Sequence, residues 1–188
     1  MLQERDATIE QLKCEVQQLR DDQDALEQHG RRHSLRISGI SDQEEDTTAA
    51  VVSLAKEVLK VLPPLYAKDV SISHRLRKPR SAGANEPCPI IVRFISRFDR
   101  DRVIRERKKL KDFNEDRPVN IYINEDLTTR RAKLFATVRS LQKRKYFKQA
   151  WTYNGNIRVM MPDGVVKPIS NVFDLKSLVP EARVEVKN

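Results

Sequence analysis

The stretch Ser34–Ile40 (Ser-Leu-Arg-Ile-Ser-Gly-Ile) alternates between polar and apolar side chains until it reaches a glycine. Strict alternation over several residues is typical of a β-strand that buries one face and leaves the other exposed. The stretch therefore predicts a half-buried strand in which Ile37 points to a core while Arg36 and Ser38 point outward.

The chain that follows this strand, up to residue 125, predicts two helices and three further strands. A helix is expected to begin at Thr47 or Thr48, either of which can cap it, and to end at Pro63-Pro64. The later elements are expected in this order: a strand over Asp69–Leu76, a mobile loop over Lys78–Pro87, a strand over Pro89–Ile95, a helix from Ser96 through Leu110, and a strand over Val119–Ile123. This order predicts an α+β domain over residues 34–125, with an antiparallel sheet and two helices on one of its faces.

The sheet face away from these helices carries the functional hypothesis. The side chains expected to point toward the helices are Ile37, Ile72, Ile90, Val92 and Phe94. The side chains expected to point outward are Arg36, Ser38, Ser71, Ser73, Arg75, Ile91 and Arg93. Three arginines from three strands would then share one surface, which Arg77 and Lys78 adjoin. Guanidinium groups pair with phosphates and stack on bases, so this surface is expected to bind a nucleic acid. The alternative is a solvated sheet face with scattered charges.

Residues 1–30 follow a heptad pattern. The apolar residues at its two inner positions are Leu2, Ile9, Leu12, Val16, Leu19 and Leu26. A period of 3.5 residues keeps one narrow seam facing a partner helix, so the pattern predicts a coiled coil that joins copies of the chain. Gly30, with His29 and Arg31, is expected to end the helix. The alternative is a single amphipathic helix that packs on its own domain.

Residues 126–180 predict a second small α+β domain, followed by a tail over residues 181–188. A helix is expected to run to about Lys145, and Asn154-Gly155 is typical of a tight hairpin turn between two strands. Trp151, in the first of these strands, is expected in the core, and the alternative is a stacking platform for a base. The side chains proposed to contact a nucleic acid here are Arg130, Arg131, Lys133, Lys143, Arg144, Tyr153 and Arg158.

The charge of the chain is unevenly distributed. The 188 residues carry a formal net charge of +9, of which residues 1–33 contribute −3, residues 34–125 +4 and residues 126–188 +8. An excess of positive charge favours a polyanionic partner. The attraction for such a partner is therefore expected in the last two thirds of the chain, and the first segment is expected to do something else.

Composition excludes several other classes of protein. Charged residues make up 34% of the chain and hydrophobic residues 39%, a balance that argues against uniform disorder. No apolar run is long enough to cross a membrane, and the N-terminus lacks the apolar region of a secretory signal. Cys14 and Cys88 are too few for a disulfide framework, so a reducing compartment is expected, the cytoplasm or alternatively the nucleus.

No catalytic or metal-binding pattern is present in the sequence. It contains neither a Walker-type phosphate loop, nor a G-x-G-x-x-G segment, nor a G-x-S-x-G nucleophile elbow. His29, His33 and His74 do not form a metal-ligand set with each other or with the cysteines. The chain is therefore expected to be non-enzymatic and to use no cofactor or metal.

The order of these parts resembles a known protein family. A coiled coil, an RRM-like βαββαβ domain and a small basic C-terminal domain follow one another in the first open-reading-frame protein of LINE-type retrotransposons. The segments that carry the resemblance are Ser34–Ile40, His74–Lys78, Pro89–Phe94 with Asp101–Ile104, and Ile121–Thr128. The segment Arg130–Leu175, and Trp151–Val159 above all, is also similar to the C-terminal region of the baculoviral few-polyhedra protein family.

The resemblance implies a self-associating nucleic-acid chaperone. Such proteins coat their encoding RNA into a ribonucleoprotein particle and aid strand annealing during target-primed reverse transcription, and their coil trimerises. The positions that match as phosphate contacts are Arg36, Arg75, Arg77, Arg93, Arg130 and Arg131. Where an RRM usually carries aromatic residues, this chain has Arg36, Ile91 and Arg93, which favours backbone binding with little sequence preference.

The function expected from the sequence is therefore binding of single-stranded RNA or DNA by a homo-oligomer. The alternative is a non-enzymatic scaffold or host-interaction protein of the few-polyhedra type, which binds protein through its sheet face.

Overall fold

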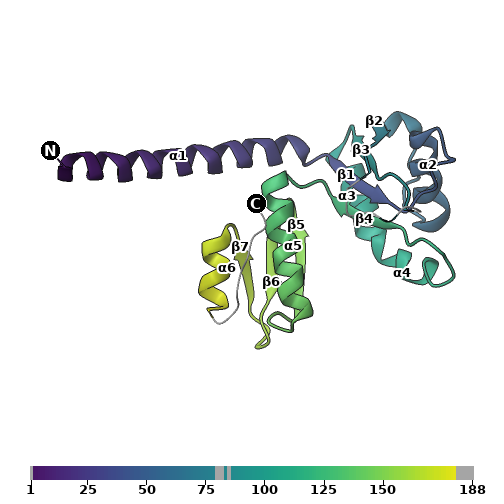
Figure 1. Cartoon of the computed structure of the whole chain (residues 1–188). Coiled ribbons are helices and arrows are strands. Elements are labelled where there is room, and N and C mark those ends of the chain that lie inside the picture. Colours follow the sequence, from purple (N-terminus) through teal and green to yellow (C-terminus); the bar gives the residue numbers. More distant parts are fainter. Residues whose placement is uncertain (1, 79–82, 84–85, 181–188) are drawn as a thin grey trace. The chain divides into compact units, whose positions relative to one another are not determined.

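The computed structural model describes residues 2–78, 83 and 86–180, with side chains from residue 5 onward (Figure 1). The chain divides into two compact units. Arg32–Asp126 forms one, and residues 1–31 join the segment from Leu127 onward in the other. Both units combine helix and strand, so the predicted α+β class is confirmed. The tail predicted over 181–188 and much of the loop predicted over Lys78–Pro87 lie outside the described residues.

The unit Arg32–Asp126 is built on a four-stranded antiparallel sheet in the order β2-β3-β1-β4. Its strands are β1 (Ser34–Ser38), β2 (Val70–Arg75), β3 (Ile90–Phe94) and β4 (Tyr122–Glu125). Its helical segments are α2 (Thr47–Ser53), η1 (Leu54–Val58), η2 (Ala67–Asp69), α3 (Arg97–Arg105), η3 (Glu106–Lys109) and α4 (Leu110–Phe113). The predicted stretch Ser34–Ile40 thus supplies a central strand of the sheet.

The core of this unit lies between one face of the sheet and the helices. Leu35, Ile37, Ile90 and Val92 are no more than 1% exposed and pack in one cluster with residues of α2 and α3. Full burial of an aliphatic side chain of this size contributes about 1.5–3 kcal/mol. The prediction that Ile37, Ile90, Val92 and Phe94 face the helices is confirmed.

Two local features hold the ends of these elements. Asp46 accepts hydrogen bonds from the backbone N–H groups of Thr48 and Ala49 at 2.9 and 3.0 Å and so caps α2. The predicted cap, Thr47 or Thr48, is therefore wrong, although α2 does begin at Thr47. Gly39, which follows β1, has φ +89°, and a Cβ there would lie 2.1 Å from the carbonyl oxygen of Asn120. Only glycine lets the end of β1 approach the chain before β4 this closely.

The predicted orientation of β2 is wrong from Ile72 onward. Val70 is opposite Phe94, but Ile72 is opposite Arg93, so β2 contains one extra residue at Ser71. Such a bulge exchanges the two faces of the strand that follows it. Ser73 therefore points to the helices, where its hydroxyl lies 2.7 and 2.8 Å from the hydroxyls of Thr47 and Thr48.

The bulge also changes the composition of the open face. Ile72, predicted to be in the core, is 56% exposed, and His74 is exposed beside it. Arg75, predicted to point outward, is opposite the fully buried Ile90 and therefore faces the helix side.

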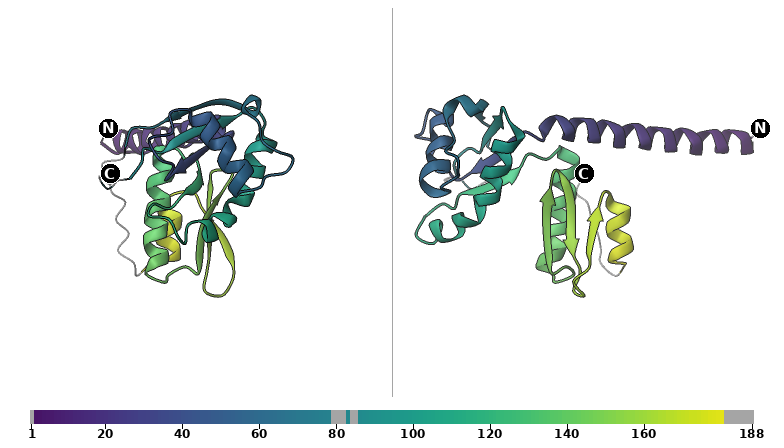
Figure 2. Two further views of the ribbon diagram at one scale, coloured as in Figure 1. Left: turned by 90° about the vertical axis from the view of Figure 1, so that its right-hand side faces the viewer. Right: turned by 180° about the vertical axis from the view of Figure 1, so that it is seen from behind.

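The second unit combines a long helix with a three-stranded sheet and two shorter helices (Figure 2). Its elements are α1 (Leu2–Arg31), α5 (Thr129–Lys143), β5 (Gln149–Tyr153), β6 (Asn156–Met160), β7 (Val166–Ile169) and α6 (Val172–Leu178), with the strands in the order β5-β6-β7. Leu134, Val138, Phe147 and Val159 are at most 5% exposed and form its core with residues of α6.

The hairpin predicted at Asn154-Gly155 is confirmed. These two residues have φ +52° and +76°, as a turn with two left-handed positions requires, and they join β5 to β6. Within the described part of the chain, no helix is both long and apolar enough to cross a membrane.

We expect Gly39→Ala to loosen the first unit, because the added Cβ meets the backbone at Asn120 and the residue must keep a positive φ. Hydrogen–deuterium exchange of peptides covering β1 and β4 should become faster. The free energy of opening calculated from it should fall by more than the about 1 kcal/mol that conformational strain alone costs. Gly164→Ala is the control, because Gly164 has φ +90° with open space around it. Unchanged exchange in β1 would contradict this account of Gly39.

Candidate nucleic-acid interface

The open face of the four-stranded sheet presents two arginines on neighbouring strands. Arg36 of β1 is opposite Ile91 of β3 and Asn124 of β4, and Arg93 of β3 is opposite Ser34. Both arginines are exposed. The predicted outward orientation of Arg36 and Arg93 is confirmed.

A buried carboxylate lies next to one of these arginines. A terminal nitrogen of Arg36 is 3.6 Å from Oδ1 of Asp126, whose side chain is only 2% exposed, whereas that of Arg36 is 44% exposed. The ion pair anchors Arg36 near the end of β4 and leaves part of its guanidinium accessible to solvent.

Arg75 is not part of this face. Its guanidinium donates hydrogen bonds to the carbonyl oxygens of Ile40, Cys88 and Glu44 at 3.0–3.2 Å, and also to that of Ser41. A further ion pair joins it to Asp42 at 3.1 Å. Arg75 therefore ties the turn after β1 to the start of β3, and the prediction that three arginines share the open face is wrong.

Tyr122 also belongs to the open face, although the sequence did not lead us to predict it there. It is opposite Ser38 at the β1–β4 edge and is 54% exposed, and its hydroxyl accepts a hydrogen bond from the side-chain amide of Asn120 at 3.1 Å. The sequence does indicate this orientation, because Tyr122 alternates with Ile121 and Ile123, which are both buried. An exposed ring and guanidinium groups on one sheet face are the combination that stacks on bases and pairs with phosphates.

The other predicted contacts of the first unit lie just after β2. Arg77 is exposed and Lys78 is half-buried, both directly after the end of that strand. They continue the chain from β2, which is an edge strand of the sheet.

The predicted contacts of the second unit fall on two sides of its sheet. Arg130, Lys133 and Lys143 are exposed on α5, and Arg144 follows directly as its C-terminal cap. Tyr153 and Arg158 belong to β5 and β6 and point away from the core that α5 covers.

The predicted burial of Trp151 in the core is also wrong. Trp151 is opposite Arg158 and shares the outward face of β5 with Tyr153, and it is half-buried. The large apolar place in the core is taken by Phe147, which is 2% exposed.

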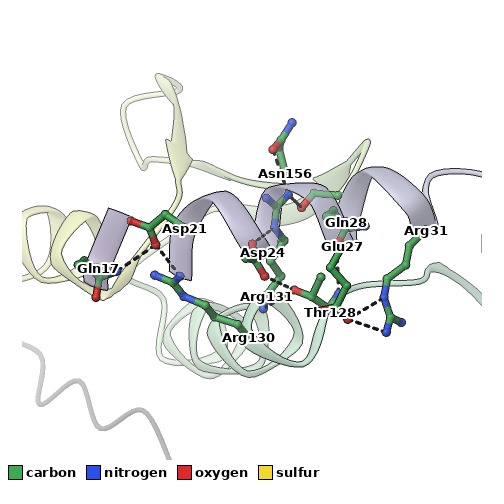
Figure 3. Close-up of polar contacts among 11 residues, drawn as sticks. Gln17, Asp21, Asp24, Glu27, Gln28, Arg31, Thr128, Arg130, Arg131 and Asn156 are labelled. Carbon is green, nitrogen blue, oxygen red and sulfur yellow. Dashed lines mark hydrogen bonds and ion pairs between the residues drawn. The ribbon is translucent and has the colours of Figure 1, made fainter. Parts of the chain in front are cut away.

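Arg131 and Arg130 are engaged with α1 (Figure 3). Nε of Arg131 donates to Asp24 at 2.7 Å, and a terminal nitrogen of the same guanidinium donates to the carbonyl oxygen of Gly155 at 3.0 Å. Arg130 forms an ion pair with Asp21 at 2.5 Å. Arg131 thereby joins α1, α5 and the β5–β6 turn at one point.

The start of α5 completes this junction. The Thr128 hydroxyl donates to Asp24 at 2.5 Å, and its backbone N–H donates to the side chain of Gln28 at 3.0 Å. The hydrogen bond from Gln17 and the contact with Arg130 lower the pKa of Asp21, although partial desolvation opposes them. Asp21 therefore stabilises the junction at pH values above its usual pKa. This stabilisation is lost as the pH falls through the lowered pKa.

The junction uses the outer face of the predicted coiled-coil helix. Asp21, Asp24 and Gln28 occupy outer heptad positions, on the side away from the apolar seam. The seam residues whose side chains are described are 45–75% exposed: Ile9, Leu12, Val16, Leu19 and Leu26. The side chain of Leu2 lies outside the described residues. The helix therefore does pack on its own chain, but through polar groups and not through its apolar seam.

Comparison with known proteins adds no assignment. No protein-family model matches the chain, and no curated protein matches it significantly.

We expect Arg131→Met to loosen the attachment of α1, because it removes hydrogen bonds to a carboxylate and to a backbone carbonyl. A hydrogen bond to a charged group contributes about 1.5–3 kcal/mol. Hydrogen–deuterium exchange should rise in residues 20–31 and in the β5–β6 turn. Arg139→Met, at an exposed position of the same helix, is the control. Equal exchange in the two variants would mean that Arg131 does not hold the junction.

Proposed function

We propose that this protein binds single-stranded RNA or DNA and self-associates through α1, acting as a nucleic-acid chaperone that coats retrotransposon RNA. The observation that carries the proposal is the placement of Arg36 and Arg93 on adjacent strands of one open sheet face, with Tyr122 on the same face. Binding through charge and stacking needs neither catalysis nor a cofactor.

The proposed domain type for Arg32–Asp126 is RRM-like. The order β1-α2-β2-β3-α3-β4 along the chain, and β2-β3-β1-β4 across the sheet, is that of a split βαβ fold. RRM domains bind single strands on the sheet face opposite their helices, using exposed rings and basic groups. In this chain the ring would be Tyr122 on β4, and the guanidinium groups would be those of Arg36 and Arg93.

The phosphate contacts are assigned by what each basic side chain already binds. Arg75 and Arg131 are occupied by carbonyl and carboxylate oxygens of the protein, so we assign them to positioning. Arg130 is a possible phosphate contact as well as a positioning residue, because the side chains of Arg130 and Asp21 in its ion pair are both about half exposed. The exposed candidates that remain are Arg36, Arg77, Arg93, Lys133, Lys143, Arg144 and Arg158.

Self-association through α1 fits the exposure of its apolar seam. The seam recurs with heptad spacing, and the junction with α5 leaves it uncovered because that junction uses the opposite side of the helix. The occupant we propose is a second and third copy of α1, since a seam of this spacing fits into that of an identical helix. Several binding units on one coil would raise avidity without any new contact, and weak individual contacts would let strands separate and re-pair.

A second function, protein binding through the same sheet face, is favoured by one observation. The bulge in β2 brings the 56% exposed Ile72 onto the open face, next to Arg93. An exposed aliphatic residue on an edge strand suits a protein surface better than a phosphate backbone. This corresponds to the scaffold alternative.

We expect Arg93→Gln to weaken binding of a fluorescent single-stranded oligonucleotide and to make its salt dependence shallower. Each phosphate contact on a single strand contributes a slope of about −0.7 in log K against log salt, so the slope should change by about that amount. Fluorescence anisotropy across a series of salt concentrations measures both quantities.

The matched control is Arg105→Gln, because Arg105 is exposed on α3, in the helix layer of the same unit. If both variants bind as the natural protein does, the sheet face is not the nucleic-acid site. Loss of a protein partner in Arg93→Gln with unchanged oligonucleotide binding would favour the scaffold function.

We expect the double variant Leu12→Ser/Leu19→Ser to be monomeric where the natural chain is an oligomer, because it removes the apolar layers on both sides of Val16 from the seam. Native mass measurement of the full chain gives the number of copies. Gln11→Ser/Gln18→Ser, at outer positions with the same seven-residue spacing, should leave the mass unchanged. An oligomer that persists in the seam variant would exclude α1 as the contact between copies.

A further inference from the structure

The outward face of the three-stranded sheet carries two aromatic rings and a guanidinium group in one cluster. Trp151 and Tyr153 are two residues apart on β5, so they point to the same side, and Arg158 of β6 is opposite Trp151. The Arg158 guanidinium is centred 5.7 Å from the Tyr153 ring. In the right-hand view of Figure 2, β5 and β6 lie in front of α5, which covers their other face.

Tyr153 and Arg158 are exposed, and Trp151 is half-buried on the same face. Ile157 and Val159, which flank Arg158, are at most 2% exposed and fill the inner face, whereas Tyr153 is 59% exposed. None of the outward residues of β5, β6 and β7 is acidic: Gln149, Trp151, Tyr153, Asn156, Arg158, Met160, Val166 and Pro168. The face therefore presents no negative charge of its own to a polyanion.

A small hollow adjoins this cluster. It has a volume of about 180 Å³, and two guanidinium-bearing residues, Arg131 and Arg158, line it together with Asn156 and Pro168. Guanidinium groups are suited to bind the oxygens of a phosphate. Arg158 therefore lies at the hollow and beside the rings at once, whereas the Arg131 guanidinium is already bound to Asp24 and to the carbonyl oxygen of Gly155.

The spacing of the rings suits neighbouring bases that are not stacked on each other. Residues i and i+2 of a β-strand are about 6.8 Å apart, which is twice the rise of about 3.4 Å between stacked bases on one strand. Trp151 and Tyr153 can therefore each meet the face of a different unpaired base, while Arg158 meets the backbone between them. The bases of a duplex are stacked on each other, so their faces are not available for this contact.

We infer that the Trp151–Tyr153–Arg158 face is a base-stacking site that recognises unpaired nucleotides, separate from the sheet face of the first unit. This inference rests on the proposed nucleic-acid binding, but it assigns a further site and a further residue, Trp151. It implies that this site depends on the bases themselves and not on backbone charge alone.

The test uses the fact that Trp151 is the one tryptophan of the chain. The full-length protein is titrated with a single-stranded oligothymidine that carries a terminal dye, and tryptophan emission and dye anisotropy are followed in parallel. Emission should fall as the oligonucleotide binds, and inorganic polyphosphate, which has charge but no bases, should leave it unchanged. If anisotropy reports binding while emission stays constant, the stacking site is wrong and the proposed function stands. If anisotropy reports no binding, the proposed function itself fails.

The variant Tyr153→Leu keeps the tryptophan reporter and removes an exposed ring. Stacking on one base contributes about 1–3 kcal/mol, so affinity for the oligothymidine should fall about 5- to 150-fold, while affinity for polyphosphate should not change. The matched control is Tyr66→Leu. Tyr66 is 55% exposed and lies 5.6 Å below the Lys68 amino group, but it is outside both sheets. Equal affinities of these two variants for oligothymidine would overturn the inference.

Discussion

The alternation of side chains in β1 is the constraint on which the rest of the first unit depends. Leu35 and Ile37 are at most 1% exposed, and burying them against α2 and α3 forces Arg36, between them, onto the opposite face. A shift of one residue would expose both apolar side chains and bury a guanidinium group without its partner, at a cost of several kcal/mol. Because β1 is flanked by β3 and β4, it also sets the places of Arg93 and Tyr122.

Burial separates arginines that build the fold from those that are accessible to a ligand. Arg100 is 4% exposed and forms an ion pair with the equally buried Glu125 at 2.5 Å, and Arg75 donates to carbonyl oxygens around the turn after β1. Breaking a buried pair by removing one partner is strongly destabilising, so such residues stabilise the fold. The number of arginines therefore overstates the number of guanidinium groups that a polyanion can contact.

The two sides of α1 have separate tasks. Its outer side carries Asp21 and Asp24, which neutralise Arg130 and Arg131 of α5, while its apolar seam stays exposed. The acidic first segment thus acts as an internal counterpart to the most basic segment. In the proposed oligomer, this arrangement would hold each C-terminal sheet on the outside of the coil, where its Trp151–Tyr153–Arg158 face is open to a single strand.

The sequence alone determined the α+β class, the β5–β6 turn at Asn154-Gly155 and the faces of β1 and β3, because local periodicity and turn chemistry depend on residues close along the chain. It also indicated the heptad seam. Only the tertiary structure decided the faces of β2, since a single bulge at Ser71 reverses an alternation that looks regular in the sequence. It likewise decided which arginines are occupied, because the acceptors of Arg75 and Arg131 lie as far as 35 and 107 residues away along the chain, and no local pattern records such a pairing.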